Sequence, residues 1–213
     1  MADFDRAQWE AYFDEDWERA HHAERGNSPT WWMGSADKLL AVVRLLGPTV
    51  DAAQREALEF ARINGGEAFM ARPYGDDLKA AQPLVMIRAM AVECRLKALW
   101  IKRNGPMVKN GKFKGPKTHD LATLAASAGL GLRPEEVAIL AKLTLWLTVH
   151  GRYPIGLEWD YDRKVRAQTG DLGPISSWGA GDSRACDQFL EDLEVMIAGA
   201  RGSAGSQPIR EDT

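Results

Sequence analysis

Apolar residues recur every three or four positions along most of the chain, which is the spacing of one face of an α-helix. The strongest repeat begins near Pro83, ends near Arg103 and predicts one long helix that is central and mostly buried. Its apolar seam has a 3-4-3-4-3 spacing and consists of Leu84, Ile87, Ala91, Cys94, Ala98 and Ile101. A polar row accompanies this seam, because Arg88, Arg95 and Lys102 are seven residues apart and therefore on one side of the helix.

Weaker repeats before this helix predict three more. We expect an amphipathic helix within 1–25, which the stretch ERGNSPT interrupts. A second helix is expected over 35–46, with Ser35 as its N-cap and Gly47-Pro48 at its end. A third helix is expected over 49–62, where NGG ends it.

Three helices are also expected after the long one. Thr118 is the expected cap of a helix over 119–128, and Pro134 opens a helix that ends at Gly151. Asp182 or Ser183 is the expected cap of the last helix, whose inward residues are Cys186, Phe189, Leu190, Leu193 and Ile197. Residues 152–181 lack periodicity and predict one long irregular loop, either a packed functional loop or a flap.

These elements predict the all-α class, because no convincing pattern of several strands is present. We expect a single-domain helical bundle that consists of an acidic N-terminal helical arm, 1–30, a helical domain, 31–200, and a disordered Gly/Ser-rich tail, 201–213. The N-terminus lacks the basic start and apolar middle of a signal peptide, and no apolar run reaches the ~20 residues that span a bilayer. Cys94 and Cys186 lie in helical patterns, so we expect reduced, buried thiols, a cytoplasmic location and no membrane association.

The stretch GPMVKNGKFKGPKTHD departs from the helical pattern and is strongly basic. Asn110-Gly111 favours a two-residue type I′ turn, which would place Val108 opposite Phe113 and Lys109 opposite Lys112. The alternative is a disordered loop whose lysines are simply solvated. A structured hairpin would carry a cationic tip, since like charges opposite each other need solvent or an anion to relieve them.

Charge is unevenly distributed in this chain of 213 residues and net charge −3. Residues 1–30 contain eight acids and three arginines, whereas residues 94–119 contain eight Lys or Arg and no acid. A basic face is therefore available despite the low overall charge, and it suits RNA or an acidic protein surface. The acidic residues 1–25 of the same chain or of a second copy are a further candidate to cover it.

Three short stretches resemble the HEPN superfamily of prokaryotic helical domains, namely AVECRLKAL with Glu93, Leu96 and Lys97, THDLATL with His119 and Leu121, and GRYP with Arg152, Tyr153 and Pro154. The resemblance implies a helical bundle, a homodimer, RNA as the target, and a defence, toxin–antitoxin or nucleotidyltransferase-associated setting. Many active members are metal-independent ribonucleases with an Arg followed four to six residues later by His. No histidine of this chain has an Arg at that distance, so we expect weak, unusual or absent cleavage.

For RNA cleavage, His119 is the candidate base for the ribose 2′-hydroxyl and Arg152 the candidate phosphate clamp. The competing interpretations are a cap or an Asp120 contact for His119, and contacts with helix-end carbonyls for Arg152. The predicted RNA- or anion-binding residues are Arg88, Arg95, Lys102, Arg103, Lys109, Lys112, Lys114 and Lys117. Glu93 and Lys97 have the spacing of a helical ion pair, and we expect neither a metal site nor a cofactor.

Two other functions stay open at this stage. The chain is alternatively a non-catalytic helical homodimer or partner-binding module whose basic face docks an acidic protein or a nucleotidyltransferase-like partner. It is also consistent with a plain structural bundle, because the pattern of the core would be the same.

Overall fold

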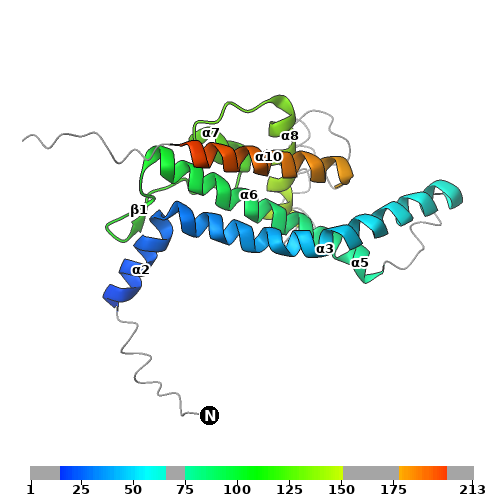
Figure 1. Cartoon of the computed structure of the whole chain (residues 1–213), viewed down its shortest axis with the longest axis horizontal. Coiled ribbons are helices and arrows are strands. Elements are labelled where there is room, and N and C mark those ends of the chain that lie inside the picture. Colours follow the sequence, from blue (N-terminus) through cyan, green and yellow to red (C-terminus); the bar gives the residue numbers. More distant parts are fainter. Residues whose placement is uncertain (1–14, 66–74, 151–177, 201–213) are drawn as a thin grey trace, which may run out of the picture.

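The chain folds as an all-α protein with one small β-hairpin (Figure 1), in a computed structural model that describes residues 15–65, 75–150 and 178–200. The helices are α2 (Glu15–Asn27), α3 (Pro29–Asn64), α5 (Asp76–Lys79), α6 (Ala81–Asn104), α7 (Leu121–Ser127), α8 (Pro134–Leu145), the π-helix η1 (Trp146–His150) and α10 (Ala180–Gly199). The hairpin consists of β1 (Val108–Lys109) and β2 (Lys112–Phe113). Residues 1–14 of the predicted arm, 151–177 of the predicted long loop and the tail 201–213 lie outside the described residues.

Helix α6 is the centre of the core, as its apolar seam predicts. Val92, Leu96 and Leu99 on this helix are fully buried. The same core cluster includes buried residues of α3, α7, α8, η1 and α10. In Figure 1, α3 lies antiparallel to α6 on one side, and α10 lies parallel to it on the other. All five inward residues predicted for α10 are buried: Cys186, Phe189, Leu190, Leu193 and Ile197.

One prediction about the first half of the chain is wrong, because 35–46 and 49–62 belong to a single helix, α3. The break instead falls at Ser28, within the predicted ERGNSPT stretch, where the Ser28 hydroxyl accepts a hydrogen bond from the Trp31 amide. Pro48 lies inside α3. Gly47 makes this tolerable, since a residue without Cβ avoids the clash that otherwise drives the residue before proline out of the helical region.

Burial on both sides of Pro48 explains why the helix continues. Val43 and Val50 are buried together with Leu84 of α6 in a second apolar cluster. Breaking α3 at Gly47-Pro48 would expose these side chains, so packing outweighs the local preference of proline, which costs about 3 kcal/mol in a helix interior.

Two helix caps also differ from the predictions. Helix α7 begins at Leu121 and its N-cap is Asp120, whose side chain accepts from the Thr123 amide at 2.9 Å, whereas Thr118 accepts from the Asp120 amide at 3.0 Å. Helix α10 begins two residues before Asp182, which accepts instead from the amide of the N-cap Gly179 at 3.0 Å. Sequence alone does not distinguish these caps, because each candidate residue has an acceptor oxygen of suitable reach.

Candidate functional site

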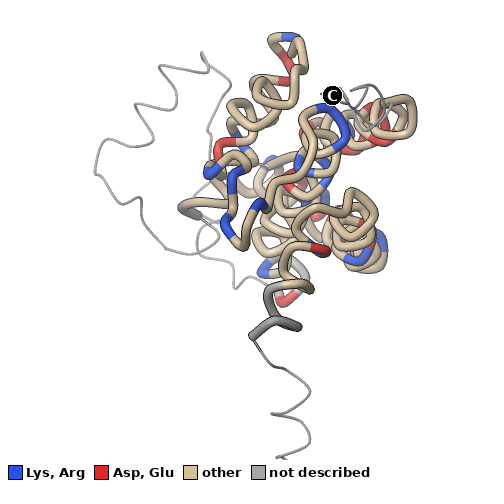
Figure 2. The backbone as a smooth tube through the Cα atoms, turned by 90° about the vertical axis from the view of Figure 1, so that its left-hand side faces the viewer, with Lys and Arg blue, Asp and Glu red and all other residues tan. Residues whose placement is uncertain are grey.

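The basic stretch forms the predicted hairpin. Asn110 and Gly111 have φ of 51° and 68°, the positive values of a type I′ turn. Val108 pairs with Phe113 and Lys109 pairs with Lys112, in the predicted register. The lysines of this stretch are all exposed: Lys109, Lys112, Lys114 and Lys117. Figure 2 looks at the molecule from this end, where basic segments gather on the hairpin side. We call the four residues Lys109, Lys112, Lys114 and Lys117 the lysine surface.

The end of α2 holds the hairpin in place. Asn27 Nδ2 donates to the Val108 carbonyl at 2.9 Å, and Asn27 Oδ1 accepts from the Val108 amide at 2.6 Å. These backbone groups of Val108 point away from β2, so the amide side chain takes the place of a further strand. Gly26 makes the close approach possible, since a Cβ at this position would lie 2.6 Å from Val108 Cγ2. The lysine surface is therefore carried by a fixed support.

The core side of the hairpin adds to this support. Met107 is fully buried, and Val108 is 4% exposed. Lys114 donates its amide to the Met107 carbonyl at 2.6 Å, which extends the pairing beyond the two strands. A Cβ on Gly115 would lie 2.8 Å from Met107 and 2.9 Å from Phe113, so the chain packs tightly where it leaves the hairpin.

His119 lies against a buried carboxylate at the edge of this segment. Its Nδ1 is 3.2 Å from Glu93 Oε1 and 3.3 Å from Glu93 Oε2, and Glu93 Oε1 is 2.5 Å from Lys97 Nζ. The Lys97 ammonium also lies 4.7 Å from the centre of the Trp32 ring. The predicted Glu93–Lys97 pair is confirmed, and the contact of His119 is with Glu93 rather than with Asp120.

This contact determines what the His119 imidazole can do. The Glu93 carboxylate paired with Lys97 only accepts hydrogen bonds, so it places the ring proton of a neutral imidazole on Nδ1. Nε2 is then left as the proton acceptor. The His119 side chain is 55% exposed, whereas that of Glu93 is 10% exposed. A buried carboxylate thus orients an accessible imidazole, an arrangement that suits general-base catalysis.

The row of cations on α6 serves the fold and does not join the lysine surface. Arg88 Nη1 contacts Asp187 of α10 at 2.8 Å, and Lys102 Nζ donates to the Ile197 carbonyl at 2.7 Å. Burial raises the pKa of Asp187, although the positive charge of Arg88 opposes this effect. Because α6 and α10 run parallel, the row spans the whole contact between them.

Arg95, the middle member of the row, joins three helices. Its Nη1 donates to the Leu190 carbonyl at 2.6 Å and lies 3.1 Å from Glu194 of α10, and its Nη2 lies 3.3 Å from Asp37 of α3. The predicted role of Arg88 and Arg95 in RNA binding is corrected here, because both side chains are buried against internal partners.

Arg103 has an internal partner as well. Its Nη1 donates to the carbonyls of Ala128 and Gly129 at 2.8 and 3.0 Å, where a cation balances the negative end of α7. Of the eight cations predicted to bind RNA, only the four of the lysine surface are exposed and have a side chain that makes neither an ion pair nor a hydrogen bond to any group in the described parts of the chain.

The second predicted catalytic residue, Arg152, lies outside the described residues. The helix before it ends as a π-helix, Trp146–His150, a rare form that occurs frequently at functional sites. Leu121 also donates its amide to the Thr144 hydroxyl at 3.0 Å, which fixes the start of α7, next to His119, against α8.

Sequence reasoning missed two residues of this site. It treated Glu93 as a partner of Lys97 alone, although a buried acid with a cation one turn away is a typical anchor for a further donor. It gave Asn27 no role, and an Asn at the end of a helix carried no signal for a contact 81 residues away.

Within residues 15–65, 75–150 and 178–200, no three His, Cys, Asp or Glu side chains are placed to hold a metal ion. In the same part of the chain, no helix has both the length and the apolar character to cross a membrane. No family model, no curated protein and no solved structure matches the chain.

Proposed function

We propose that the protein is a HEPN-like, metal-independent ribonuclease that binds RNA on the lysine surface and uses His119 as its general base. The observation that carries this proposal is the contact of 3.2 Å between Glu93 and His119. His119 follows Lys117, a member of the lysine surface, by two residues. A single residue of the chain thus separates His119 from the last lysine of the surface that would hold the substrate. The resemblance of AVECRLKAL and THDLATL to HEPN domains supports RNA as the target, in a prokaryotic defence or toxin–antitoxin setting.

Phosphate is the ligand that suits the lysine surface. Lys109 and Lys112 lie opposite each other on the hairpin, so their charges repel unless an anion lies between or over them. Lysines act as point charges and recognise phosphates without reading bases. We expect RNA binding that tolerates any sequence and weakens with salt, with a logarithmic slope of roughly −0.7 for each phosphate contacted.

His119 would act on the ribose. Nε2 takes the proton of the 2′-hydroxyl, the 2′-oxygen forms a bond to phosphorus, and the bond from phosphorus to the 5′-oxygen breaks. The leaving 5′-oxygen takes a proton from water. The products are a 2′,3′-cyclic phosphate and a 5′-hydroxyl, and water later opens the cyclic ester. Glu93 is a positioning residue in this step, because it orients the ring and stabilises the imidazolium.

The binding half of the proposal is tested with a labelled single-stranded RNA and fluorescence anisotropy. Lys109→Glu with Lys112→Glu should weaken binding at least tenfold, since four units of charge change at the tip. The control is Arg55→Glu with Lys79→Glu, which makes the same change of charge on α3 and α5, away from the hairpin. A poly-glutamate that competes as well as RNA of equal charge would reject this half and favour docking of an acidic protein.

Cleavage is tested separately, with end-labelled RNA and metal chelator present throughout. His119→Ala should lower the rate by about 10²–10⁴ without loss of RNA affinity, the usual contribution of a general base. Glu93→Gln should lower the rate less and alter its pH profile, because the neutral amide still accepts from Nδ1 but no longer stabilises the imidazolium. Binding without any cleavage by the wild type would reject the ribonuclease and leave the binding half standing.

A further inference from the structure

The outer face of α3 carries a long seam of exposed positions. Ten residues of this helix follow an alternating spacing of four and three, and every one of them is exposed: Trp31, Ser35, Lys38, Val42, Leu45, Thr49, Ala52, Glu56, Glu59 and Ile63. The buried residues of α3, such as Leu40 and Val50, lie on the opposite side. We call the ten residues the outer seam.

Apolar side chains of the outer seam are unusually accessible. Leu45 is 77% exposed, Ile63 66% and Trp31 46%. Leu46, beside the seam, is 42% exposed. A mean spacing of 3.5 residues is the repeat of a coiled coil, in which a second helix covers such a stripe. The 36 residues of α3 give a stripe of about 54 Å, and the far end of the helix extends beyond α6 and α10 (Figure 1).

We propose that a second copy of this chain covers the outer seam, with its own α3 antiparallel, so that the two helices form a two-fold coiled coil. The seam is complementary to itself in this direction. Trp31 meets the partner's Ile63, Lys38 meets the partner's Glu56, and Val42 meets the partner's Ala52. Leu45 meets the partner's Thr49 near the two-fold axis, where the Leu46 side chains add apolar cover.

Charge selects the antiparallel direction. In a parallel pair in register, Lys38 would face the partner's Lys38 and Glu56 would face the partner's Glu56, and both contacts are repulsive. The antiparallel pair places an ammonium opposite a carboxylate at these two levels instead. The self-complementary match also favours a second copy over an unrelated partner, because one helix supplies both members of each layer.

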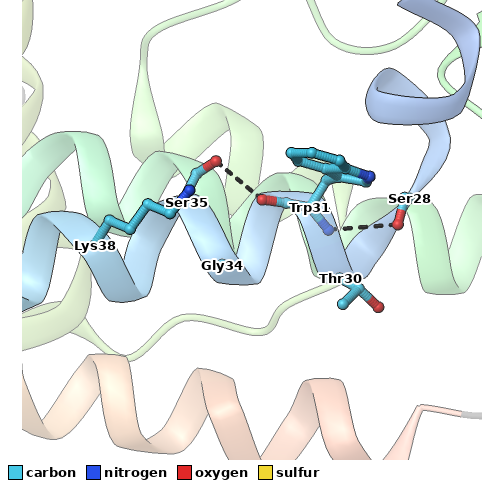
Figure 3. A pocket seen from close by; sticks show the side chains of 6 residues that line it. All are labelled: Ser28, Thr30, Trp31, Gly34, Ser35 and Lys38. Atoms are coloured by element: carbon cyan, nitrogen blue, oxygen red, sulfur yellow. Dashed lines mark hydrogen bonds between the residues drawn. The ribbon is translucent and has the colours of Figure 1, made fainter. Parts of the chain in front are cut away.

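The surface at the start of α3 has the shape that such a contact needs. Trp31, Gly34, Ser35 and Lys38 line a shallow hollow of about 340 Å³ (Figure 3). These four positions, i, i+3, i+4 and i+7, are the ones that form a coiled-coil hole. Gly34 leaves it open, since a Cβ there would have no atom within 4 Å. The antiparallel register places the partner's Glu59 over this hollow, opposite Ser35 and between the levels of Trp31 and Lys38.

The oligomeric state of the full chain tests the proposal, by sedimentation velocity over a range of concentrations. The wild type should be a dimer, and Leu45→Lys should be a monomer, because two ammonium groups would be placed beside the axis. The matched control is Leu58→Lys, an equally large change at a residue of α3 that is 69% exposed but off the seam. Circular dichroism should show the helical spectrum of the wild type for both variants. A monomeric wild type, or an equal effect of the two variants, would overturn the proposal.

Cross-linking tests the direction of the two helices. Lys38→Cys and Glu56→Cys chains, mixed and oxidised, should form a disulfide between the two kinds of chain, and neither variant alone should cross-link to itself. A Lys38→Cys chain that cross-links to itself would show a parallel pair and reject the proposed register. Neither outcome depends on RNA binding or cleavage, so this test is separate from that of the proposed function.

Discussion

Asn27 binds both backbone groups of Val108, with its amide nitrogen 2.9 Å from the carbonyl and its oxygen 2.6 Å from the amide. One side chain at the end of α2 thereby completes the outer edge of a hairpin 81 residues away. Because Val108 is buried, water cannot replace these two bonds without rearrangement of the hairpin. The position of the lysine surface thus depends on a residue that carries no charge.

Replacing Asn27 by Ala should lower the free energy of unfolding by about 1–3 kcal/mol, since a buried donor and acceptor lose their partner. Urea denaturation measures this change, and the Val108 amide should exchange its hydrogen faster in the native state. Asn104→Ala is the control, because the Asn104 side chain bonds only to Trp100 in its own helix, at the surface. Equal losses for the two variants would contradict the role assigned to Asn27.

Arg95→Met and Lys109→Ala should each change a different property. The first should lower the stability of the protein, and the second should lower its affinity for RNA. Arg95→Met removes the contacts with Leu190, Glu194 and Asp37, and should cost about 1–3 kcal/mol of unfolding free energy while leaving RNA affinity unchanged. The carboxylates are more than half exposed, so the loss stays below that of a fully buried pair.

Lys109→Ala should leave the free energy of unfolding within about 0.5 kcal/mol of the wild type, since Lys109 is exposed and its side chain has no partner among the residues that the structure describes. Its RNA affinity should fall, and the salt dependence of binding should become less steep by roughly 0.7. Thermal unfolding and anisotropy titrations at several salt concentrations measure both effects. Loss of affinity for the folded Arg95 variant would return the α6 row to the binding surface.

Pro48→Ala should raise the stability of the protein by about 1–2 kcal/mol. The substitution restores a backbone donor in the interior of α3, and only part of the gain is lost to the greater freedom of the unfolded chain. Gly47→Ala should then stabilise the Pro48→Ala variant more than it does the wild type. In the wild type, the Cβ added at position 47 would clash with the ring of Pro48, and this clash is absent once Pro48 is replaced. A double-mutant cycle of melting temperatures measures this coupling.

The two cysteines should resist thiol reagents while the protein is folded. Burial raises the pKa of Cys94 to about 11 and that of Cys186 to about 12, so thiolate is scarce at pH 8. A coloured disulfide reagent should react slowly with the native protein and quickly with both thiols in urea. Cys186 is buried and Cys94 is half-buried, and rapid reaction of either thiol in native buffer would contradict the prediction.

The same two pKa shifts make the free energy of unfolding depend on pH. The folded protein holds these two protons more tightly than the unfolded chain, whose thiols titrate near 9.0. Their contribution to stability is therefore complete below about pH 9 and declines as the pH rises towards 11 and 12. Cys186→Ala should reduce this decline, which urea titrations above pH 9 would measure.

Features with a short-range cause were predicted from the sequence. The type I′ turn at Asn110-Gly111 and its register follow from two adjacent residues that accept positive φ. The apolar seam of α6, of which Leu84, Ala91, Ala98 and Ile101 are buried, and the inward residues of α10 follow from the helical period, because a continuous apolar stripe must be covered. The ion pair of Glu93 and Lys97 follows from their separation by one turn.

Features that depend on which elements become neighbours were not predicted from the sequence. The continuation of α3 through Pro48 depends on the burial of Val43 and Val50 against Leu84. A stripe of Arg88, Arg95 and Lys102 has the same pattern whether it faces water, RNA or a parallel helix with acids at a matching interval. The contact of Glu93 with His119 likewise appears only when α6 and the start of α7 are packed together.

The sequence by itself thus determined the helical class, the cationic hairpin and the residues that line the core, since each is encoded within a few turns of chain. The tertiary structure alone decided which charged side chains are paired with internal partners and which stay exposed at the surface. The physical reason is that a charge acts on whatever lies within a few ångströms, and the fold brings those neighbours from distant parts of the chain.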